Sequence, residues 1–94
     1  NSVPKGKIVV DNGALNALRS RKSLLPSGII AVEGVFNQGD VVKINEVAKA
    51  VPAYNSSEIE TLMGKHTSEV AELYGRGRRD EIARPEDIVF LVEA

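Results

Sequence analysis

The apolar segments of this chain are short and are bounded by Gly, Pro and Asn, and this spacing limits the folds open to it. Five segments have the composition of strands. They cover residues 7–11, 28–32, 41–44, 47–51 and 88–92. Because these strands do not alternate regularly with helices, a parallel sheet built from strand–helix–strand units is not expected. The pattern predicts an α+β fold, mostly β, in which a small, partly closed barrel carries short helices.

The first helix is predicted directly after the first strand. Asp11 and Asn12 are residue types that cap helix N-termini, and apolar residues follow them at helical spacing. The helix is expected to end near Arg21, because Pro26 cannot continue it. The turn signal at 37–39 then predicts that segments 28–32 and 41–44 form a hairpin.

Two further helices are predicted before the last strand. Asn55 and Glu58 have the spacing of a capping box, with Gly64 as the stop of that helix. A third helix is expected over 66–75. Its expected inward-facing residues are Val70, Leu73 and Tyr74.

Composition narrows the kinds of chemistry available. The chain has 94 residues, which fit one domain, and 43% of them are hydrophobic. It has no cysteine, which excludes disulfides, thiolate nucleophiles and cysteine–zinc sites. Its formal net charge of −1 argues against strong non-specific binding to nucleic acid, which needs a basic excess. No segment approaches the about 20 apolar residues of a transmembrane helix.

The sequence predicts neither a catalytic residue nor a metal ligand. The single histidine, His66, excludes a multi-histidine metal site and is expected at the surface or as a cap. The stretch GKHT resembles the end of a phosphate-binding loop, but that loop needs a glycine five residues before Gly64, where Ile59 stands. The paired carboxylates of the two later helices are expected on solvated faces.

Basic residues gather in two places. They are Arg19, Arg21 and Lys22 after the first helix, and Arg76, Arg78 and Arg79 in a later loop. The first group suits the negative end of a helix dipole, and the second suits a solvated loop. Binding RNA would require both groups on one face with aromatic side chains nearby.

Several motifs stand in a fixed order along the chain. Residues 6–14 read GKIVVDNGA, residues 22–29 read KSLLPSGI, and residues 32–40 read VEGVFNQGD. YNSSE at 54–58 and GKHTSE at 64–69 follow. Together these motifs resemble the C-terminal domain of the bacterial glutamate 5-kinases, over nearly the whole chain.

The resemblance implies a PUA domain, a fold named for pseudouridine synthases and archaeosine transglycosylases. It implies a mixed-strand pseudo-barrel with short helices over 6–94, after a linker at 1–5. It further implies a cytoplasmic parent enzyme that phosphorylates the γ-carboxylate of glutamate with ATP and Mg²⁺ in proline biosynthesis. The catalytic residues of that family belong to an N-terminal amino-acid-kinase domain that is absent from this sequence, so none is carried over and no cofactor is expected here. The start at Asn1, without Met, fits a piece of a longer protein.

Three functions stay open at this point. The first is an accessory, non-catalytic domain that influences oligomer state, magnesium dependence or proline feedback, with the kinase domain and a homo-oligomer as partners. The second is RNA binding in the groove that PUA domains have between the first helix and the next strand. The residues that the resemblance places there are Arg19, Arg21, Lys22, Ser23 and Gly28. The third is a stand-alone paralogue with an unrelated partner, and no membrane partner is expected.

Overall fold

The computed structural model describes residues 4–74 and 81–91, apart from the side chains of Thr67 and Ala71. The strands are β1 (Gly6–Val10), β2 (Ile29–Gly34), β3 (Val42–Ile44), β4 (Ala48–Ala50) and β5 (Ile88–Phe90). The helices are α1 (Asn12–Arg19), α2 (Ser56–Leu62) and α3 (Thr67–Tyr74), with the 3-10 turns η1 (Pro26–Gly28) and η2 (Pro85–Asp87). The strands form one mixed sheet in the order β2-β1-β3-β4-β5. This is the α+β, mostly β, fold that the sequence predicts.

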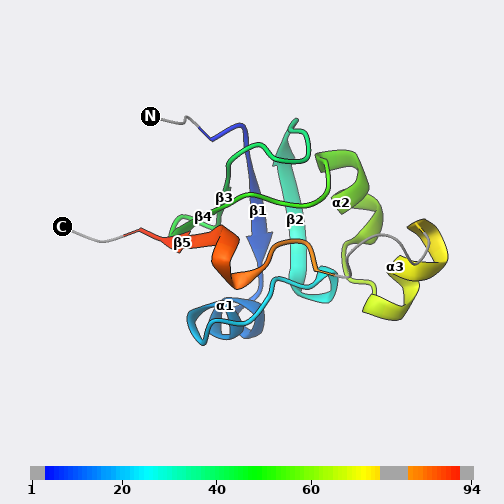
Figure 1. Cartoon of the computed structure of the whole chain (residues 1–94), viewed down its shortest axis with the longest axis horizontal. Coiled ribbons are helices and arrows are strands. Elements are labelled where there is room, and N and C mark those ends of the chain that lie inside the picture. Colours follow the sequence, from blue (N-terminus) through cyan, green and yellow to red (C-terminus); the bar gives the residue numbers. More distant parts are fainter. Residues whose placement is uncertain (1–3, 75–80, 92–94) are drawn as a thin grey trace.

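The helices lie around the sheet in two places (Figure 1). Helix α1 follows the end of β1, while α2 and α3 lie together on the side of β2. The predicted N-caps are confirmed: Asp11 Oδ1 accepts a hydrogen bond from Ala14 N–H at 2.7 Å. Asn55 and Glu58 form the expected capping box, with hydrogen bonds of 2.8 and 2.9 Å. The described helices do not include one long and apolar enough to cross a bilayer.

The predicted hairpin of segments 28–32 and 41–44 is wrong, because β1 lies between them. Strand β1 pairs antiparallel with β2 and parallel with β3. The turn itself is present, since Asn37 N–H donates to Asp40 Oδ2 at 2.8 Å and Gly39 has a φ of 90°. A turn signal shows that the chain reverses, but it does not determine which strand the returning segment meets. Here the chain crosses to the far edge of β1.

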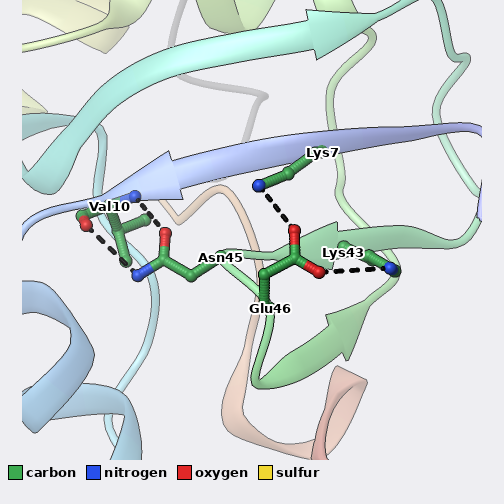
Figure 2. A network of polar contacts seen from close by, with 5 residues as sticks. All are labelled: Lys7, Val10, Lys43, Asn45 and Glu46. Carbon is green, nitrogen blue, oxygen red and sulfur yellow. Dashed lines mark hydrogen bonds and ion pairs between the residues drawn. The ribbon is translucent and has the colours of Figure 1, made fainter.

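A tight turn joins β3 to β4 and holds the end of β1. Asn45 has a φ of 50°, in the left-handed region that Asn tolerates better than most residues. Its Oδ1 accepts a hydrogen bond from Val10 N–H at 2.9 Å, and its Nδ2 donates to the Val10 carbonyl oxygen at 3.3 Å (Figure 2). The Asn45 side chain thus makes the hydrogen bonds to Val10 that a neighbouring strand would make, because β3 has ended at this point.

The core lies on one face of the sheet and includes residues of α2 and α3. Ile8, Ile44 and Ile59 are fully buried there. Tyr54 is buried too, and its ring lies 5.8 Å from the ring of Tyr74.

The third helix presents a narrower face to this core than the sequence predicts. Val70 is buried and Tyr74 packs on Tyr54, as expected. Leu73 is 50% exposed, so its predicted inward position is wrong. Successive side chains of a helix project about 100° apart. Leu73 therefore lies outside the stripe of Val70 and Tyr74 through which α3 packs. The basic cluster Arg76, Arg78 and Arg79 and the predicted strand end at Val92 lie outside the described residues.

Replacing Asn45 tests its role at the end of β1. Asn45→Ala removes both hydrogen bonds to buried Val10. It also places at positive φ a residue that tolerates this conformation less well than Asn does, so we expect a loss of about 2–3 kcal/mol in the free energy of unfolding. Asn45→Gly keeps the backbone conformation, and Asn45→Asp keeps the acceptor for Val10 N–H. Both should lose less in urea unfolding, and equal losses for all three variants would contradict this role.

Candidate binding groove beside helix α1

A shallow groove of about 270 Å³ runs between the start of α1 and the turn that leads into β2. Its lining residues are Asp11, Gly13, Ala14, Ala17, Ser23, Leu25, Ser27 and Gly28. Ser23 and Gly28 are two of the residues that the sequence places in a binding site.

Close backbone packing at Gly28 forms one wall of this groove. A Cβ added at Gly28 would lie 2.5 Å from the Cβ of Ala14, so a larger residue would push α1 away. The Asp11 N–H donates to the Gly28 carbonyl oxygen at 3.0 Å. Because Gly28 has no side chain, the first turn of α1 can pack closely against η1.

Ser23 is connected to a distant part of the chain. Its Oγ donates to Glu81 Oε2 at 2.6 Å. Beside it, Leu24 and Ala83 form an isolated antiparallel bridge. These contacts fix the segment that forms the floor of the groove. The sequence did not indicate Glu81, because no local pattern predicts a contact between two residues as far apart in the chain as Ser23 and Glu81.

Arg19 and Arg21 line a different hollow, of about 230 Å³, on the other side of α1. The remaining lining residues are Leu18, Pro85, Ile88 and Phe90. The guanidinium carbon of Arg19 lies 5.2 Å from the ring centroid of Phe90, within cation–π range. This hollow thus combines two cations with an aromatic ring.

Arg21 occupies the position where helices commonly end in glycine. Its N–H donates to the Leu18 carbonyl oxygen and the Lys22 N–H donates to that of Ala17, both at 3.0 Å. This is the Schellman pattern, and Arg21 has the left-handed φ of 65° that it requires. A side chain in this conformation costs about 1–2 kcal/mol relative to the usual helical region. Strained residues of this kind cluster at functional sites.

The five residues predicted for one site are therefore divided. Ser23 and Gly28 line the groove, Arg19 and Arg21 line the second hollow, and Lys22 is exposed outside both. They are close in sequence, but the reversal of the chain after α1 sends their side chains to different sides.

The second hollow offers cationic and aromatic groups. Residues 4–74 and 81–91 contain no group of three or more His, Cys, Asp or Glu that could hold a metal ion. His66 lies at the start of α3, where its backbone N–H donates to Glu69 Oε1 at 3.1 Å. The guanidinium groups and Phe90 offer anion contacts and stacking.

Comparison with known proteins identifies the family of the chain. The PUA domain model matches residues 6–74. The chain therefore belongs to the PUA domain family, as the sequence motifs indicate.

Similar curated proteins are named glutamate 5-kinase. The chain is 45% identical over 93 residues to that of Aquifex aeolicus and 40% identical over 87 residues to that of Methanococcoides burtonii. These alignments cover 94% and 88% of this chain but 26% and 23% of the relatives. The chain thus spans about a quarter of the length of the proteins it matches.

A solved structure supports the fold independently. A PUA domain from Aeropyrum pernix K1, crystallised as a tartrate complex, matches with a TM-score of 0.61 and 32% sequence identity. The match covers 85% of this chain and 41% of that chain.

A matched set of variants tests the packing at Gly28. Gly28→Ala should lower the free energy of unfolding by about 1–3 kcal/mol, because the new methyl group overlaps Ala14. Ala14→Gly removes the overlapping atom, so the double variant should lose less than the sum of the two single losses.

Gly13→Ala is the control, since its Cβ would meet only Asp11 Oδ1, at an ordinary 3.5 Å. Urea unfolding of the four variants measures the coupling. Additive losses would show that Gly28 and Ala14 do not form a close contact.

Proposed function

We propose that this chain is the non-catalytic C-terminal PUA domain of a glutamate 5-kinase. The observation that carries the proposal is the alignment, which covers nearly all of this chain and about a quarter of each relative. The motifs from Gly6 to Asp40 occur in the order expected for that domain. The parent protein would be a cytoplasmic enzyme of proline biosynthesis that phosphorylates the γ-carboxylate of glutamate.

The chemistry would then belong to another part of the parent protein. ATP and Mg²⁺ would bind in its kinase domain, and the PUA domain would act on that domain from outside the active site. Its means would be surface contacts that alter oligomer state, magnesium dependence or proline inhibition. Two hollows beside α1, on a domain built around a five-stranded sheet, suit a domain that works by binding.

Deleting residues 6–94 from the full-length parent protein tests this role. We expect glutamate phosphorylation to persist, with a shift of about fivefold or more in magnesium dependence or proline inhibition, or with a changed oligomer mass. Initial rates across Mg²⁺ and proline concentrations, with light scattering for the mass, measure these properties. The intact parent protein is the control.

Two results would contradict the proposal. One is a deletion variant whose rates, magnesium dependence, proline inhibition and mass all equal those of the intact protein. The other is a gene in which a start codon directly precedes Asn1, which would favour a stand-alone paralogue.

RNA binding is a second candidate, supported by the hollow beside Arg21. Unpaired bases are recognised by stacking on aromatic rings and guanidinium planes, with basic groups on the phosphates. Arg19, Arg21 and Phe90 provide this combination, and Arg21 retains a cation where glycine would be less strained. The net charge of −1 restricts such binding to a local site.

Arg21→Gly separates stability from binding at this hollow. The variant should be more stable by about 0.5–1 kcal/mol, since glycine adopts positive φ freely, yet it should bind RNA more weakly. Fluorescence anisotropy with a hairpin RNA that has an unpaired loop, at low salt, measures the affinity. Lys22→Gln removes one charge outside the hollow and serves as the control.

The RNA candidate fails if the unmodified chain shows no affinity at low salt. It also fails if Lys22→Gln weakens binding as much as Arg21→Gly does, since the contribution would then be charge alone.

A further inference from the structure

A row of lysines crosses the face of the sheet opposite the core. Lys7 on β1 faces Lys43 on β3, and Lys43 faces Lys49 on β4. Directly opposed residues on neighbouring strands project to the same side of a sheet, about 5 Å apart. Three lysine side chains therefore project from the same face of three adjacent strands. The row ends at Val89 on β5.

Like charges in opposed positions destabilise a sheet, and Glu46 relieves part of this repulsion. Its Oε2 lies 2.6 Å from Lys7 Nζ, and its Oε1 lies 3.4 Å from Lys43 Nζ (Figure 2). The hydrogen bonds from Lys7 and Lys43 hold the pKa of the Glu46 carboxyl below its ordinary value. Glu46 thus shows how a carboxylate is bound between two members of the row.

The third lysine, Lys49, lacks such a partner in the part of the chain that the structure describes. Within residues 4–74 and 81–91, the ion pairs of the structure do not include Lys49. Lys49 instead borders a hollow of about 340 Å³. The other lining residues are Val41, Ala50, Val51, Asp87 and Val89. Val51 and Val89 are 38% and 65% exposed, so an apolar surface lies directly beside Lys49.

We propose that this face binds a protein segment that carries a carboxylate beside an aliphatic side chain. The carboxylate would lie between Lys43 and Lys49, as Glu46 lies between Lys7 and Lys43. The aliphatic group would cover Val51 and Val89. In the free chain the lysines of the row repel one another, and the carboxylate of the partner would offset this repulsion.

The chemistry of the face favours protein over RNA. All four aromatic residues of the chain lie elsewhere. Phe36 and Tyr54 are buried, and Tyr74 packs on Tyr54. Phe90 pairs with buried Ala48, so it projects to the face of the sheet opposite Lys49. Bases would have no ring on which to stack.

Titration with a short peptide tests the proposal. The probe is an acetylated and amidated hexapeptide of sequence Ala-Glu-Leu-Glu-Val-Ala, and its control has Gln in place of each Glu. We expect the probe to shift the NMR signals of residues 41–51 and 87–89, and to bind more weakly as salt increases. The Gln peptide should shift them much less.

Variants of the protein locate the contact. Lys49→Gln should weaken the probe about threefold to fivefold, as expected for one exposed ion pair. Lys65→Gln, between α2 and α3, removes the same charge elsewhere and should have no effect. Urea unfolding of both variants checks that the fold is retained, and the peptide pair tests the charge requirement even if one variant is unstable.

Three results would overturn the proposal. The first is the absence of shifts at millimolar probe. The second is equal binding of the Glu and Gln peptides. The third is oligouridylate that shifts the same residues and displaces the probe, which would assign the face to nucleic acid.

Discussion

Strand β1 is hydrogen-bonded along both of its edges, and the surfaces of the domain depend on its position. Its antiparallel pairing with β2 brings the start of that strand, and with it Gly28, to the first turn of α1. Its parallel pairing with β3 places Lys7 beside Lys43. Because Asp11 follows β1 directly and caps α1, the same strand also fixes the helix between the two hollows.

Two residues other than glycine adopt positive φ in the described part of the chain, and they do so for different reasons. Asn45 tolerates this conformation and gains two hydrogen bonds to Val10, so its strain is offset within the fold. Arg21 completes the end of α1 through its backbone alone, and glycine would serve as well there. Its side chain instead contributes charge to the hollow that contains Phe90. The conformation of Asn45 is therefore explained by its hydrogen bonds, whereas the backbone contacts of Arg21 do not account for its side chain.

Local features of the fold could be predicted from the sequence, because their causes are local. The caps at Asp11 and Asn55 depend on residues three positions away, and the motifs from Gly6 to Asp40 identify the family. The strand order could not be predicted, because a turn at 37–39 gives no information about the strand on the other side of β1. Leu73 was misplaced because periodicity does not give the width of the face that α3 buries.

The candidate sites depend even more on distant contacts. Ser23 and Gly28 line one groove, and their separation from Arg19 and Arg21 follows from how the chain reverses after α1. Glu81 reaches Ser23 from the other end of the chain. The lysine row exists only in the registers of three strands, so no single segment of sequence contains it.

Native-state hydrogen exchange tests most directly whether β1 holds these surfaces together. The backbone amides of Ile8 and Val10 should exchange only through global unfolding, with the same free energy that urea unfolding gives for the whole domain. The amides of the edge strand β5 should open at lower free energy. Exchange of the β1 amides at a free energy clearly below the global value would contradict the central position that this account assigns to β1.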